Sequence, residues 1–162
     1  LIRRGLAALA RGESLGGDPG PYLLQAAIAA CHARAFRPEE TDWTRITELY
    51  GILAEVMPSP IVELNRAVAV SMAFGPQAGL DLADQVAAEP SLRGYHLLPS
   101  VRGDLLMKLG RTAEAQAEFQ RASELTANAR ERELSQQRAR AAAAEPPAAS
   151  APEPPSPPAS PY

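Results

Sequence analysis

The chain has 162 residues, of which 46% are hydrophobic and 22% charged, and its formal net charge at pH 7 is −3. This composition is that of one globular domain, and it lacks the basic excess that binding to nucleic acid or to an anionic membrane requires. No apolar run approaches the roughly 20 residues that cross a bilayer, so we expect no membrane partner. The single cysteine, Cys31, excludes an internal disulfide, which fits the cytoplasmic location that we expect.

The spacing of apolar residues predicts helices along most of the chain. β-Branched and aromatic residues never alternate over a useful length, so no strand is predicted. Pro21, Pro60 and Pro76 each suit the first turn of a helix, and Asp42 and Ser59 can cap one. The predicted helices, about eight in all, cover residues 1–11, 21–36, 43–53, 60–75, 76–89, 95–109, 112–125 and 128–142.

The end of the chain differs from the rest in composition. Eight of the 16 prolines lie between Ala141 and Tyr162. Proline fixes φ and removes a backbone donor, which favours an extended, solvated segment. The sequence therefore predicts a helical domain over residues 1–142 and a disordered tail rich in Pro, Ala and Ser over residues 143–162.

A 34-residue unit, "HLLPSVRGDLLMKLGRTAEAQAEFQRASELTANA", runs from His96 to Ala129. It carries small or aromatic residues at the positions typical of a tetratricopeptide (TPR) repeat, namely Gly103, Gly110, Ala115, Phe119 and Ala122. Small residues let paired helices approach closely, and the aromatic ring fills the space between pairs. With two weaker copies over residues 27–60 and 61–94, this period predicts an all-α, TPR-like α-solenoid of antiparallel helix pairs. A generic helical bundle is the alternative.

Several local segments also resemble one protein family. In chain order they are "GPYLLQAAIAACHA" (20–33), "TDWTRITELYGIL" (41–53), "PSPIVELNRAVAV" (58–70), "GPQAGLDL" (75–82) and "GYHLL…LLMKLGRTAEA" (94–115). Together they resemble the C-terminal extension of a group of bacterial extracytoplasmic-function (ECF) RNA polymerase sigma factors, which carry a TPR-like domain after their promoter-binding regions. The resemblance covers roughly residues 1–134.

The resemblance implies a regulatory domain in transcription initiation. Its implied partners are the promoter-binding regions of the same sigma factor, core RNA polymerase, or both. The sequence lacks those promoter-binding regions, so we expect a fragment that does not bind DNA directly. It also departs from the family at Cys31, where a small or aliphatic residue is usual, and at Pro99, where a histidine is frequent. A free-standing TPR adaptor that binds a peptide or helix is the alternative function.

The adjacent Cys31 and His32 raise the question of chemistry. Neighbours on a helix point about 100° apart, so these two side chains do not face one another. His96 is the only other histidine, which leaves a zinc site short of ligands. We therefore expect no catalytic residue, no metal and no cofactor, and an enzyme is the least favoured interpretation.

The first helix of each TPR pair lines the concave surface of such an array. On this basis the candidate protein-binding residues are Asn65, Met72, Asp104, Met107 and Lys108. Arg66 is a further candidate as the polar neighbour of Asn65, and Gln25 and His32 are candidates because they share one stripe of an earlier helix. Met72 and Met107 would form an adaptable apolar strip, with Asn65 and Asp104 as polar contacts for a peptide or helix. The alternative is that both methionines fill the core.

Overall fold

The computed structural model describes residues 20–35 and 37–146, and within them every regular element is helical. The helices are α2 (Pro21–Arg34), α3 (Trp43–Val56), α4 (Pro60–Phe74), α5 (Pro76–Ala87), α6 (Leu97–Lys108), α7 (Thr112–Leu125) and α8 (Ala129–Ala144), with short 3-10 helices η1 (Pro38–Glu40) and η2 (Pro90–Leu92). The all-α prediction is confirmed. The sequence predicts about eight helices, and the described residues contain seven α-helices. The other predicted helix, residues 1–11, lies outside the described part of the chain.

The helices begin where local chemistry predicts. Pro21, Pro60 and Pro76 occupy first turns, where a missing N–H costs no hydrogen bond. The Asp42 carboxylate caps α3 by accepting a hydrogen bond from the backbone N–H of Arg45 at 3.0 Å. Between α6 and α7, Gly110 has a φ of 72°, a left-handed conformation that favours glycine.

The end of α8 differs slightly from the predicted domain boundary. The helix continues to Ala144, two residues past the expected end at residue 142. Alanine has the highest helix propensity, so the run Ala141–Ala144 extends the helix until the chain nears Pro146. Residues 147–162, most of the predicted tail, lie outside the described part of the chain.

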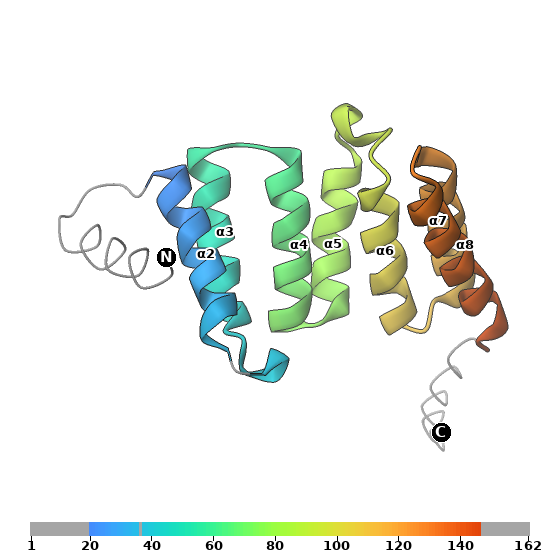
Figure 1. Ribbon diagram of the computed structural model, residues 1–162, viewed down its shortest axis with the longest axis horizontal. Coiled ribbons are helices and arrows are strands. Elements are labelled where there is room, and N and C mark those ends of the chain that lie inside the picture. Colours follow the sequence, from blue (N-terminus) through green and yellow to red (C-terminus); the bar gives the residue numbers. More distant parts are fainter. Residues whose placement is uncertain (1–19, 36, 147–162) are drawn as a thin grey trace, which may run out of the picture.

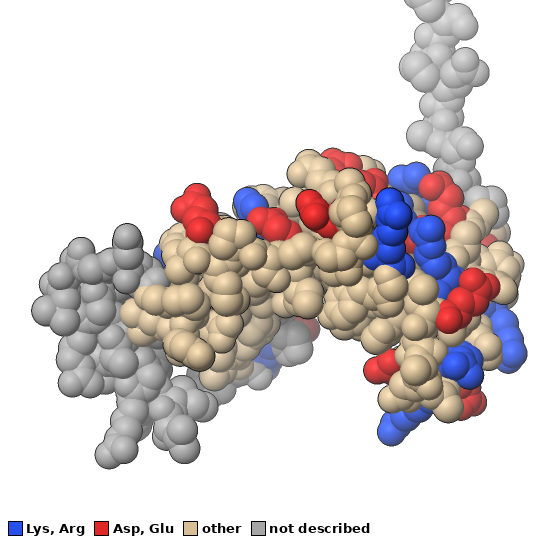
Figure 2. Space-filling view, turned by 90° about the horizontal axis from the view of Figure 1, so that it is seen from above, with Lys and Arg blue, Asp and Glu red and all other residues tan. Residues whose placement is uncertain are grey.

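The helices form a row in which each packs against the next in sequence order (Figure 1). In addition, α4 contacts α6, two places along the row. Seen from above, the row bends so that one side of the molecule is hollowed (Figure 2). A row of this kind leaves part of each helix without a neighbouring helix.

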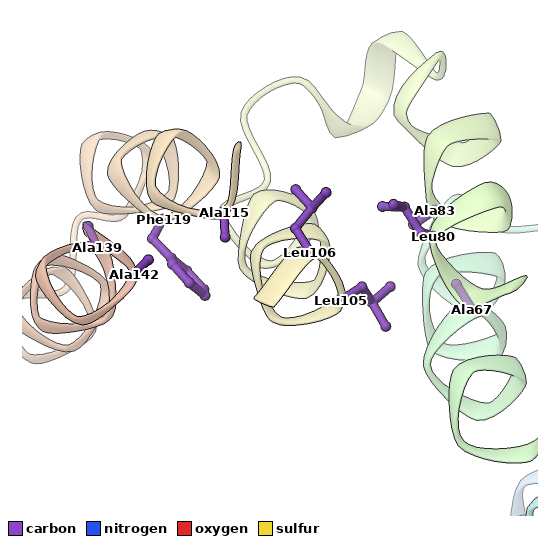
Figure 3. Packing of buried hydrophobic residues seen from close by; sticks show 9 residues of the cluster. All are labelled: Ala67, Leu80, Ala83, Leu105, Leu106, Ala115, Phe119, Ala139 and Ala142. Atoms are coloured by element: carbon purple, nitrogen blue, oxygen red, sulfur yellow. The ribbon is translucent and has the colours of Figure 1, made fainter. Parts of the chain in front are cut away.

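The core consists of more than one cluster of buried side chains. The C-terminal cluster contains Ala67, Leu80, Ala83, Leu105, Leu106, Ala115, Phe119, Ala139 and Ala142 (Figure 3). Phe119 projects from α7 into the space between α6 and α8, and its neighbours are mostly alanines that permit close approach (Figure 3). The N-terminal cluster contains Leu24, Ala27, Ile28, Ile46, Leu49, Leu53, Val62 and Ala69, from α2, α3 and α4.

Candidate functional site

Helix α4 has a side that none of the buried clusters covers, including a third cluster of Leu64, Val86, Leu92 and Leu98. Ala67 belongs to the C-terminal cluster, whereas Val62 and Ala69 belong to the N-terminal one, so α4 is buried on two sides. A third side presents Ile61, Asn65, Val68 and Met72, whose spacing places them in one line along the helix. The exposed fractions of Ile61, Val68 and Met72 are 46%, 36% and 46%. Such exposed apolar side chains in a line form a candidate surface for a partner.

Helix α6 carries a line of residues with the same spacing, Leu97, Val101, Asp104 and Lys108. Leu97 is 42% exposed, whereas Val101 is half-buried and packs against two of the buried clusters, at the inner margin of this line. The two lines meet where Lys108 Nζ lies 4.0 Å from the Met72 sulfur. We call these eight residues the α4–α6 face; it combines an apolar centre with a few polar groups.

Asp104 forms a polar edge of the α4–α6 face. Its carboxylate accepts a hydrogen bond of 3.4 Å from the Arg138 guanidinium of α8. The same guanidinium lies 5.8 Å from the centre of the Phe119 ring, so it also covers the C-terminal cluster. Burial raises the pKa of Asp104 above its usual range, although Arg138 and Lys108 act in the opposite direction.

The structure brings some of the predicted binding residues together and separates others. Asn65, Met72, Asp104 and Lys108 all belong to the α4–α6 face. Met107 is half-buried against the C-terminal cluster, which is the position the alternative interpretation gave it.

Arg66 lies on a different side of α4. It lines a cavity of about 460 Å³ between α3, α4 and α5. There it donates a hydrogen bond of 3.4 Å to the Glu63 carboxylate, and its Nε is buried without a hydrogen-bond partner in the described part of the chain. Arg66 is therefore a wall residue of this cavity and does not contribute to the α4–α6 face.

Sequence reasoning missed Ile61 and Val68. The signal was present, because both share the helical spacing of Asn65 and Met72. Apolar residues are normally assigned to the core, however, and only the arrangement of neighbouring helices shows that these two are exposed.

The residues of α2 show no arrangement typical of catalysis. Gln25 and His32 are exposed, and the His32 ring meets the Trp43 ring edge-on with centroids 5.3 Å apart. Burial, together with the negative charge of Asp42, raises the pKa of the Cys31 thiol, whereas an activated nucleophile needs a lowered one. Among the residues searched, 20–35 and 37–146, no group of three or more His, Cys, Asp or Glu side chains could hold a metal ion.

The repeat positions lie at the contacts between helices. Ala115, Phe119 and Ala122 are buried in α7, and Gly103 is buried in α6. Gly110 forms the turn between α6 and α7. None of the helices in the described ranges combines the length and the hydropathy needed to cross a bilayer.

The chain is similar to an uncharacterized protein of Rhizobium meliloti (strain 1021), with 52% identity over 113 residues. The aligned part covers 70% of this chain and 26% of that protein, so it spans about a quarter of the relative's length. No family model matches the chain. No solved structure matches it either.

Proposed function

We propose that this chain is a regulatory protein-interaction domain of an ECF-type RNA polymerase sigma factor. The assignment to this class rests on the five segments that resemble the C-terminal extension of these factors. The observation that carries the interaction role is the α4–α6 face, where Ile61, Val68 and Met72 expose apolar side chains that no described helix covers. A domain acting through such a face binds and orients a partner and performs no chemistry itself.

We further propose that the helices form a TPR-like solenoid. Three observations support this fold: the helices pack in sequence order, α4 contacts α6, and Gly103 of α6 lies directly against Phe119 of α7. In a solenoid the first helices of successive pairs line one surface. The contact between Lys108 and Met72, from α6 and α4, fits that arrangement.

The proposed partner surface is an apolar segment of the promoter-binding regions in cis, or of core RNA polymerase. An amphipathic helix places apolar side chains on one face at intervals of three and four, which suits the spacing of Ile61, Val68 and Met72. Asn65 and Lys108 would contact polar groups at the edge of that helix. The Rhizobium relative supports a domain within a larger protein, because about three quarters of its length lies outside the aligned part.

The first test is to sequence the DNA upstream of the codon for Leu1. An in-frame coding region for sigma-factor promoter-binding regions supports the proposal. A start codon for this chain with no such region before it contradicts the sigma-factor assignment and favours a free-standing adaptor.

The second test measures binding. The chain is immobilised, and its affinities for the promoter-binding regions encoded upstream and for core RNA polymerase are determined by biolayer interferometry. We expect the double variant Val68→Asp/Met72→Asp to lose binding to its partner by about tenfold or more, because it places two charges in an apolar contact. The matched control is Ile52→Asp/Leu134→Asp, which changes two exposed apolar residues on α3 and α8. Equal affinities for the wild type and the Val68→Asp/Met72→Asp variant would refute the proposed face.

A further inference from the structure

A second cavity, of about 300 Å³, lies where η2, α6 and α7 meet. Its lining consists of the apolar residues Ala87, Leu92, Leu98, Pro99 and Leu125, and the charged residues Arg93, Arg102, Glu118 and Arg121. A volume of this size is at the lower end of those found for small-molecule sites, which are mostly apolar with a few polar groups. This cavity shares no residue with the α4–α6 face.

One of the three arginines, Arg102, is already engaged in ion pairs. Arg102 donates from Nε to the Asp84 carboxylate at 3.0 Å and from Nη1 to Glu118 Oε1 at 2.6 Å. Glu118 turns its second oxygen, Oε2, into the protein, where it is buried. The charge of Glu118, which also lines the cavity, is therefore offset by Arg102.

The positive charges of the other two arginines, Arg121 and Arg93, are not fully neutralised by nearby carboxylates. Arg121 is 3.9 Å from Glu118 Oε1, which Arg102 already holds at a shorter distance. Arg93 is exposed and has no carboxylate within ion-pair distance among the described residues. Two arginines that line one cavity thus lack a full counter-charge, and a bound anion would supply it.

The surroundings of the cavity favour an anion as well. Between Arg93 and Arg140 the chain has nine basic and six acidic side chains, whereas between Asp42 and Glu89 it has two basic and seven acidic ones. Seen from above, the Lys and Arg side chains accordingly gather over the half of the molecule that contains α6, α7 and α8 (Figure 2). A local basic excess in a chain of net charge −3 attracts anions to this end of the row.

We propose that this cavity binds a small organic anion, a carboxylate or a phosphate monoester carried on an apolar body. The guanidinium groups of Arg93 and Arg121 match the geometry of these anions, since each can donate two parallel hydrogen bonds to a pair of oxygens. Leu98, Pro99 and Leu125 then contact the apolar body. The proposal is independent of the sigma-factor assignment and of the α4–α6 face.

The test uses the full chain and four probes, phenyl phosphate, benzoate, benzyl alcohol and inorganic phosphate, in isothermal titration calorimetry. We expect saturable binding of phenyl phosphate or benzoate. We expect binding about tenfold weaker or absent for benzyl alcohol, which lacks the charge, and for inorganic phosphate, which lacks the apolar body. Absence of saturable binding by both organic anions at millimolar concentration would overturn the proposal. Equal affinity for inorganic phosphate and phenyl phosphate would overturn the proposed ligand class.

Variants locate the site. Arg93→Gln/Arg121→Gln should weaken binding of the organic anion by about tenfold, because both charge-assisted contacts are removed. The control Arg34→Gln/Arg130→Gln makes the same change in net charge on α2 and α8 and should leave the affinity unchanged. An equal loss in both double variants would show a general charge effect and refute the site. Circular dichroism checks folding, and the single variant Arg93→Gln replaces the double variant should the latter unfold.

Discussion

The aromatic ring of Phe119 lies directly against the backbone of Gly103. A Cβ atom at position 103 would lie 2.6 Å from Cε1 of the ring and within 2.9 Å of two further ring carbons. Phe119 is only 2% exposed, and its ring lies among α6, α7 and α8 (Figure 3). The close approach of α6 and α7 therefore depends on the absence of a side chain at Gly103.

We predict that Gly103→Ala lowers the free energy of unfolding by about 1–3 kcal/mol, because the added methyl group overpacks the contact with Phe119. Urea denaturation measures the change. The matched control is Gly51→Ala in α3, where the nearest atom to a new Cβ, Arg66 Nε, is 4.0 Å away. There alanine should raise stability by about 0.5–1 kcal/mol through its higher helix propensity. A Gly103→Ala variant as stable as the wild type would show that the two helices are not in tight contact.

Arg102 connects three helices, since it bonds Asp84 of α5 and Glu118 of α7 from its place in α6. Arg102→Met keeps the apolar stem but leaves the largely buried Glu118 carboxylate without its main counter-charge. We expect a loss of about 2 kcal/mol, less than for a fully buried pair because Arg102 is partly exposed to solvent.

Urea denaturation of a second variant separates charge from packing. Adding Glu118→Gln to Arg102→Met removes the uncompensated carboxylate and should recover much of the lost stability. Equal stabilities for the single and the double variant would show that the loss comes from packing of the Arg102 stem.

Asn128 caps α8, because its side-chain oxygen accepts hydrogen bonds from the backbone N–H groups of Arg130 at 2.9 Å and Glu131 at 3.4 Å. Asn128→Ala should cost about 1 kcal/mol in urea denaturation. Ser59 occupies the same position before α4 but makes no side-chain cap hydrogen bond, so Ser59→Ala should change the stability much less. Similar effects in the two variants would contradict the assigned difference between the caps.

The pKa of Asp104 predicts a pH dependence of stability. Burial raises this pKa in the folded state, so the folded protein holds the proton more tightly than the unfolded chain does. The contribution of Asp104 to the free energy of unfolding is therefore largest at acidic pH. This contribution is lost as the pH rises from about 3.8, the reference pKa, through the higher pKa of Asp104 in the folded protein.

Asp104→Asn removes this titration. As the pH rises through that window, the free energy of unfolding of the wild type should fall relative to that of the variant. At pH 7 the wild type should be the less stable of the two. Urea denaturation of both proteins between pH 3 and pH 7 gives the difference. A difference that favours the wild type increasingly as the pH rises would show that the ion pair with Arg138 outweighs burial.

Much of the secondary structure followed from residues close together in the sequence. Pro21, Pro60 and Pro76 begin helices as predicted, and Asp42 caps α3. These features depend on backbone groups within four residues, which the sequence displays directly. The sequence also predicts the contact of Gly103 with Phe119, because a small and an aromatic residue stand at the repeat positions where paired helices meet.

The candidate binding residues were harder to predict. Helices α4 and α6 are each buried on two sides: Leu98 of α6 belongs to a cluster with Val86 of α5, while Gly103 of α6 packs against Phe119 of α7. Apolar residues then point in several directions, and the helical period alone does not show which side remains open. The sequence therefore predicts one strip of Met72 and Met107, whereas in the structure Met107 packs against the core and Met72 is exposed.

Local sequence was thus sufficient for the all-helical class, the helix starts and the small residues at close contacts, because each depends on the size, φ preference or capping group of a few neighbouring residues. The open α4–α6 face and the cavity of Arg93, Arg102 and Arg121 depend instead on which helices cover which sides. Arg102, for example, meets partners 16 and 18 positions away in sequence. Contacts over such separations arise only when the helices pack, so the tertiary structure was needed to find both sites.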